Sequence, residues 1–171
     1  MDYGIQLYSV RDLAEKDLSA AVKRVAELGY SSVEFAGFFG HSADEVNEML
    51  RENNLRVSST HSGFDDLVNN YDETVAFHKA IGNKLYIIPA YGLDSQEKLD
   101  DFVKKASEIS KRLSQDGITL AYHNHSREFI PNADGSLIYD QLLYRTDLKL
   151  EVDTYWAFVG MKNPIALLDR E

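Results

Sequence analysis

Short apolar runs alternate along the whole chain with longer segments in which apolar residues recur every three or four positions. The runs predict strands at residues 4–9, 32–36, 55–60, 84–90, 118–123 and 148–153. The longer segments predict amphipathic helices, the first of them from the spacing of Leu18, Ala21, Val22, Val25 and Leu28. Two more helices are expected late in the chain, at residues 136–144 and after Asn163-Pro164. Strict alternation of strands and helices predicts right-handed βαβ crossovers and a parallel sheet.

Capping residues mark where several of these helices begin. Ser42 and Glu45 have the spacing of a capping box, in which each residue satisfies a backbone donor of the first turn. Asp17, Asn70 and Ser95 stand at the starts of three other helical patterns. Glycines that can end a helix follow three of the patterns, at Gly29, Gly82 and Gly117.

Two architectures fit this alternation: an open, doubly wound sheet or a (β/α)₈ barrel. No Gly-x-Gly-x-x-Gly motif follows the first strand, and its absence counts against the open sheet that binds dinucleotides. In both architectures functional groups lie at the carboxyl ends of the strands. Polar side chains recur at those ends in this sequence, at Gln6, Tyr8, Glu34, His61, His123, His125 and Asp153.

The alternation of side chains along each strand sorts these polar residues by face. Where apolar residues face the helices, their neighbours face the barrel axis. This predicts that one inner set is formed by Gln6, Tyr8, Glu34, His123, Glu151 and Asp153. His61 shares its parity with Leu55 and Val57, so a β-bulge or an early strand end is needed to turn it inward.

Composition and charge narrow the class of protein. The 171 residues include 28 acidic and 18 basic ones, for a formal net charge of −10, and this field disfavours a nucleic acid partner. There is no cysteine, which excludes disulfides and thiolate metal sites. The amino-terminal residues lack the pattern of a signal peptide, and no apolar stretch reaches the length of a membrane span. We therefore expect a cytoplasmic protein without a membrane partner.

The strongest chemical signal is the segment 122–129, Tyr-His-Asn-His-Ser-Arg-Glu-Phe, directly after a buried strand. Polar groups gathered there must pair, bind a metal or take part in chemistry, because removing them from water is otherwise costly. A second acidic strand end follows at residues 151–156, Glu-Val-Asp-Thr-Tyr-Trp. Together the two segments indicate a polar, metal-binding site. Purely structural roles are also open: hydrogen-bonded histidines, an Asp153 that caps a helix, and a Glu151 that belongs to a buried polar network.

The chain resembles the sugar phosphate isomerase/epimerase family of xylose-isomerase-like TIM barrels. The resemblance rests on residues 4–12, on the strand Val33-Glu34-Phe35-Ala36-Gly37, and above all on the segments 122–129 and 151–156. It implies a TIM (β/α)₈-type barrel in one domain, residues 1–171, with about six βα units present. Eight such units need about 240 residues or more, so we expect the last two to be lacking. An isolated chain of this kind is expected to be unstable or to pair with a second copy as a homo-oligomer.

The resemblance also implies roles for individual residues. Asp153 corresponds to a metal ligand on the sixth strand. Tyr122 or His123 lies where ketose epimerases carry a metal-binding glutamate on the fifth strand, and His123 is the metal ligand expected there. Glu34 and His61 correspond to substrate-facing residues, and Trp156 stands where many epimerases have a histidine that contacts substrate. Gln6 and Tyr8 complete the substrate-binding set. The catalytic acid–base groups expected are His125, Glu128 and His61.

The implied chemistry is proton transfer next to a carbonyl, assisted by a divalent metal ion. Mixed nitrogen and oxygen ligands suit Mn, Co, Fe, Zn or Mg, and the substrate is a ketose, a sugar phosphate or a related keto-polyol. Relatives that dehydrate keto-inositols keep a lyase activity open. The same fold would also be compatible with an endonuclease IV-like DNA repair enzyme, or with a non-catalytic remnant of the barrel.

Overall fold

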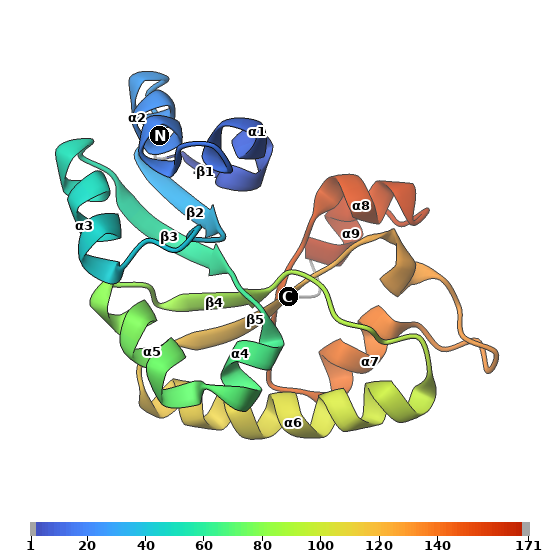
Figure 1. The fold of residues 1–171 in the computed structure, drawn as a ribbon. Helices are drawn as coiled ribbons and strands as arrows, with labels where there is room; N and C mark the ends of the chain where they lie inside the picture. The colour runs from blue at the N-terminus through green and yellow to red at the C-terminus, as the bar shows by residue number, and fades with distance from the viewer. Residues whose placement is uncertain (1–2, 169–171) are drawn as a thin grey trace. The chain divides into compact units, whose positions relative to one another are not determined.

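The strands follow one another in space in the order in which they occur in the sequence. The computed structural model describes residues 3–168, in which two compact units are distinguished, unit 1 (Met1–Tyr86) and unit 2 (Ile87–Glu171). Hydrogen bonds join the strands of this part of the chain in the order β1-β2-β3-β4-β5-β6. Figure 1 labels the first five of these strands. In doubly wound sheets the strand order reverses at a switch point, whereas in a TIM barrel it follows the sequence. The topology therefore favours the barrel-type architecture over the open sheet.

Unit 1 contains the first βα repeats. Its strands are β1 (Gly4–Gln6), β2 (Ser32–Ala36) and β3 (Arg56–His61), and β4 (Leu85–Ile88) crosses into unit 2. The intervening segments form the short 3-10 helix η1 (Leu7–Val10) and the helices α1 (Arg11–Ala14), α2 (Leu18–Glu27), α3 (Ala43–Glu52), α4 (Phe64–Asn69) and α5 (Tyr71–Ala80). β1 pairs with β2 and β2 with β3, both in parallel, as the alternation predicted.

The core of unit 1 forms between β2 and the helices beside it. Val33 and Phe35 of β2 are fully buried together with Val22 of α2 and Val46 of α3. Both β2 residues point to the helix side, as their alternation with Glu34 predicted. The same alternation leaves Glu34 on the other face, where it is buried among polar groups.

Most of the predicted helix starts in unit 1 are confirmed. Asp17 accepts a hydrogen bond from the Ala20 amide at 2.9 Å, and Ser42 and Glu45 form both bonds of a capping box. Asn70 precedes α5 but makes no capping bond with its side chain. The short helix α4 was not predicted, because its six residues carry too brief a pattern to register as helical.

The first strand is shorter than predicted, and this corrects the position of Tyr8. β1 ends at Gln6, and the chain turns into η1, where Leu7 is buried. Tyr8 is 56% exposed on this turn, with the Arg11 guanidinium 4.5 Å from its ring centroid. The inward strand position predicted for Tyr8 is therefore wrong, since side-chain parity cannot be continued past the end of a strand.

The irregularity expected in the third strand is present. β2 and β3 pair in register at Val33 and Val57, but Glu34 then pairs with Ser59, so Ser58 is an extra residue. One inserted residue reverses the parity of every residue after it. The bulge thus removes the conflict between His61 and the apolar residues Leu55 and Val57.

Unit 2 continues the alternation of strands and helices and contains one long helix, α6. Its elements are α6 (Gln96–Gln115), β5 (Thr119–His123), the 3-10 helix η2 (Ser126–Phe129), α7 (Ile138–Arg145), β6 (Lys149–Glu151), α8 (Thr154–Val159) and α9 (Pro164–Leu168). Ser95 caps α6 through the Lys98 amide, as predicted. The buried ring of Phe102 packs edge-on against Tyr122 of β5 at 5.8 Å. None of the described helices is both long and apolar enough to span a membrane.

Candidate metal centre and neighbouring polar groups

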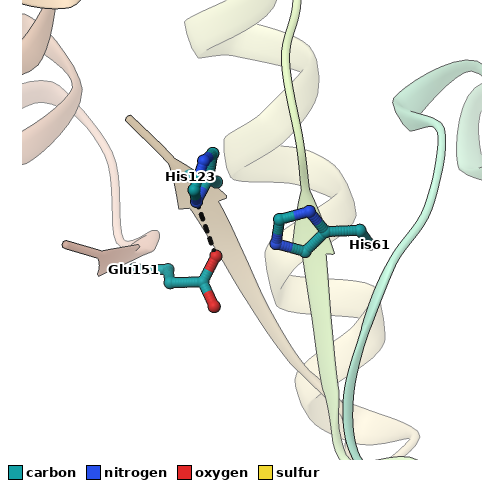
Figure 2. Close-up of side chains that lie close together, drawn as sticks. All are labelled: His61, His123 and Glu151. Carbon is teal, nitrogen blue, oxygen red and sulfur yellow. Dashed lines mark hydrogen bonds and ion pairs between the residues drawn. The ribbon is translucent and has the colours of Figure 1, made fainter. Parts of the chain in front are cut away.

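The carboxyl ends of β5 and β6 bring an imidazole and a carboxylate together in unit 2. The strands are parallel, and their register places His123 beside Glu151. The His123 Nδ1 atom lies 2.8 Å from Glu151 Oε2 (Figure 2). A carboxylate only accepts hydrogen bonds, so Nδ1 carries a proton, and in the neutral tautomer of this ring the lone pair is on Nε2. Glu151 therefore fixes the tautomer and the orientation of His123.

Asp153 presents its second oxygen to the other nitrogen of the same ring. Its Oδ1 atom accepts from the Trp156 amide at 2.8 Å and caps α8, so the capping role considered for Asp153 is observed. Its Oδ2 atom lies 3.7 Å from His123 Nε2. The cap thus holds one oxygen and directs the other toward the imidazole lone pair.

The buried side chain of Asn124 holds the backbone of Asp153 in place. Its Oδ1 atom accepts from the Asp153 amide at 2.9 Å, and its Nδ2 atom donates to the Asp153 carbonyl at 3.2 Å. This two-way bond joins the end of β5 to the turn after β6. The position of Asp153 is therefore set by two contacts, at its backbone and at one carboxylate oxygen.

The spacing of His123 and Asp153 fits two ligands of one divalent metal ion. Two ligands of one ion, each about 2.1 Å from it, lie about 3.0 to 4.2 Å apart over the usual range of angles. The 3.7 Å between His123 Nε2 and Asp153 Oδ2 falls in that range. A histidine that ligates metal commonly donates its other N–H to a carboxylate, which is the arrangement of His123 and Glu151.

His125 and Trp156 border this group. The ring centroids of His125 and His123 are 4.8 Å apart, and those of His125 and Trp156 are 5.5 Å apart. Burial, followed by the neighbouring His123, lowers the pKa of His125 below its usual value. Its imidazole is therefore neutral at pH 7 and able to accept a proton.

Glu128 lies within a closed network. The side chain is fully buried and accepts from the Tyr122 hydroxyl at 3.0 Å, from Arg127 Nε at 2.9 Å and from the His125 amide at 2.8 Å. Burial and then Glu128 raise the pKa of Tyr122, which keeps the phenol protonated as a donor. Three donors thus converge on one carboxylate.

Unit 1 holds a second polar group at the ends of β1, β2 and β3. Gln6 Nε2 donates to Glu34 Oε1 at 2.6 Å and lies 3.2 Å from His61 Nε2. His61 Nε2 is also 3.2 Å from Glu34 Oε1, and Ser59 donates a short hydrogen bond to the other oxygen of Glu34. The buried carboxylate of Glu34 therefore orients an amide, an imidazole and a hydroxyl.

Within each unit the structure brings several of the candidate residues together. Unit 2 brings together His123, His125, Asp153 and Trp156, and unit 1 brings together Gln6, Glu34 and His61. Three contributors were not singled out from the sequence: Asn124, Ser59 and Glu151 as the partner of His123. Side-chain alternation had placed Glu151 on the same face as His123, but only the register of β5 and β6 in the structure pairs the two directly. Nothing in the local pattern distinguishes Asn124 as a clamp on Asp153.

The chain matches the family model for the xylose isomerase-like TIM barrel over residues 22–170. It belongs to this family, which confirms the fold class inferred from the alternation and from the segments 122–129 and 151–156. No curated protein matches the chain.

Solved structures give the same fold at low sequence identity. Two sugar phosphate isomerase/epimerases from Parabacteroides distasonis share 24% and 23% identity, with TM-scores of 0.77 and 0.84. The first match covers 98% of this chain and 73% of the other, and the second covers 99% and 74%. A family 2 AP endonuclease from Brucella melitensis shares 17% identity at a TM-score of 0.76, over 99% of this chain and 75% of that one. These similarities support the architecture and leave the activity to the residues of the site.

Proposed function

We propose that the chain is a divalent-metal-dependent isomerase or epimerase that moves a proton next to the carbonyl of a ketose, a sugar phosphate or a related keto-polyol. The observation that carries the proposal is the set Glu151–His123–Asp153, in which one imidazole lies between two carboxylates at adjacent strand ends. In the TIM-barrel fold the ends of the strands are the usual place for catalytic groups.

His123 and Asp153 are the residues that would hold the metal, and Glu151 keeps His123 in the tautomer that offers Nε2. Mixed imidazole and carboxylate ligands suit Mn, Co, Fe, Zn or Mg. When bound, such an ion supplies Lewis acidity that polarises a carbonyl and stabilises the negative charge that develops on its oxygen. The capped carboxylate and the clamped backbone of Asp153 keep this donor set in place before substrate arrives.

His125 is the group assigned to proton transfer in unit 2. Its lowered pKa keeps the ring neutral near pH 7, so that it can take a proton from carbon and return it. Trp156, whose ring lies near His125, offers an apolar wall for the carbon face of a sugar. Both side chains follow strand ends, where a substrate can approach.

The polar group of unit 1 is assigned to substrate binding and to a second proton transfer. The Gln6 amide and the Glu34 carboxylate are suited to bonding hydroxyl groups, and His61 is a second acid–base candidate oriented by Glu34. Tyr8, exposed on η1, offers a further aromatic contact for substrate.

Metal affinity tests the proposal directly. His123→Gln and Asp153→Asn each replace one metal ligand with little change in side-chain shape. Each is therefore expected to weaken divalent metal binding by about 10-fold or more. His41→Gln, which alters a histidine on a different loop, should bind as the wild type does. Isothermal titration with Mn²⁺, Co²⁺ and Zn²⁺ measures the change. Equal affinity and stoichiometry in all four proteins would contradict the assignment.

A further inference from the structure

The carboxylate of Glu128 is enclosed by donors from its own unit. Oε1 accepts from the Tyr122 hydroxyl and from Arg127 Nε, and Oε2 accepts from the backbone amide of His125. The side chain is 0% exposed, so no substrate proton can reach it without opening of the turn. A fully buried carboxylate that accepts three hydrogen bonds from protein donors is better suited to holding structure than to exchanging protons.

The bond to the His125 amide closes the turn between β5 and η2. That turn sets the position of the His125 ring, which lies 4.8 Å from His123 and 5.5 Å from Trp156 between ring centroids. Arg127 extends the network, because its Nη2 atom donates to the Tyr91 carbonyl at 2.7 Å. Tyr91 lies in the loop between β4 and α6, so the network fastens two neighbouring loops of unit 2 to each other.

From these contacts we infer that Glu128 is a positioning residue, which fixes the backbone of His125 and thereby places the His125 imidazole against Trp156. This role replaces the acid–base role expected for Glu128 from the sequence. It rests on the proposed function only where it assigns proton transfer to His125. The placement of the ring itself does not depend on any activity.

Glu128→Gln separates this role from general packing. A glutamine has the same shape but offers one acceptor and one donor, whereas three donors converge on the two oxygens of Glu128. It can satisfy Tyr122 and Arg127 on one side or the His125 amide on the other, but not both. Tyr122→Phe is the matched control, since it removes a donor from the same buried carboxylate and leaves the bond to His125 in place.

Amide hydrogen exchange at His125, followed by NMR, is the measurement that needs no substrate. Loss of a buried bond worth about 1–3 kcal/mol corresponds to an increase of about 5- to 150-fold in the exchange rate of the His125 amide in Glu128→Gln. Tyr122→Phe should leave that rate within about threefold of the wild type after correction for global stability. Should Glu128→Gln fail to fold, the wild-type chain still decides. A His125 amide that exchanges there as fast as in an unstructured peptide overturns the inference.

The second readout is steady-state kinetics with a ketose that the wild type converts. Misplacing the His125 ring should lower kcat by about 10- to 100-fold in Glu128→Gln while KM changes less than about threefold. Equal effects of Glu128→Gln and Tyr122→Phe on both exchange and kcat would overturn the positioning role. Failure of the proposed function shows differently: the exchange result stands, and no ketose is turned over by the wild type.

Discussion

His78 shows how one buried side chain can make the stability of unit 1 depend on pH. The residue is 3% exposed, and its Nδ1 atom accepts from Asn83 Nδ2 at 3.2 Å. Burial lowers the pKa of His78 from 6.5 to about 4. The folded state therefore favours the neutral ring of His78, which lies in the last turn of α5.

The sign of the pH effect follows from this shift. As the pH falls below 6.5 the unfolded chain takes up a proton that folded His78 resists until about pH 4, so protons favour unfolding in that window. The contribution is fully present above pH 6.5 and lost toward pH 4, by about 3 kcal/mol in the free energy of unfolding.

Urea unfolding across this window measures the effect. His78→Gln should flatten the dependence on pH, and His41→Gln, at a more exposed histidine, should keep the wild-type slope. A His78→Gln protein that loses stability on acidification as steeply as the wild type would show that another group is responsible.

At the level of single residues, the sequence predicted polar strand ends well and their partners less well. The parity of Glu34 and His123 was predictable because strand geometry alone determines it. The pairing of His123 with Glu151 depends on the register between two strands far apart in the sequence, which no local pattern gives. The exposure of Tyr8 was missed because β1 ends at Gln6, three residues before the end of the predicted strand.

At the level of elements, Gly160 allows α8 to pack closely against η2. A Cβ atom at this position would lie 2.7 Å from Phe129 Cδ2 and 3.0 Å from its Cβ. The backbone of Gly160 is in a region that any residue adopts, with φ −76°, so the constraint is steric. Phe129 is buried in a small apolar cluster of unit 2 with Tyr139, Ala157 and Leu167.

Gly160→Ala is therefore expected to destabilise the chain by about 1–3 kcal/mol through overpacking. Gly92→Ala is the matched control, because no atom outside the neighbouring residues lies within 4 Å of a Cβ built there. Thermal unfolding of the two variants and the wild type checks the difference. If Gly160→Ala and Gly92→Ala had the same melting temperature, the contact between α8 and η2 would be looser than described.

The elements themselves were largely predictable, with boundaries shifted by a few residues. Helix starts at Asp17, Ser42 and Ser95 were set by capping chemistry that acts within one turn of the chain. The sequence indicated a bulge only because His61 shares its parity with the apolar residues Leu55 and Val57. The position of the bulge at Ser58 is known from the pairing of β2 with β3 in the structure. The helix α4 was missed because its stability depends on tertiary packing of Phe64 and Leu67, not on a long periodic pattern.

At the scale of the molecule, strand order carries the most information about the fold. An order that follows the sequence indicates a barrel type of fold, and the family match agrees. β1 and β6 are the two ends of that order among the described residues, and unpaired strand edges favour association with other chains. Pairing with a second copy therefore stays a prediction, as does a small-molecule substrate.

Metal-dependent proton transfer next to a carbonyl can be measured as deuterium incorporation from D₂O. A panel of free ketoses, ketose phosphates and a keto-inositol would be followed by ¹H NMR with Mn²⁺ or Co²⁺ added or with a chelator. We predict that the wild type exchanges the proton on the carbon beside the carbonyl of at least one panel member. Exchange should stop with chelator and fall about 100-fold or more in Asp153→Asn. Metal-loaded wild type that exchanges no proton in any of these compounds would contradict the proposed chemistry.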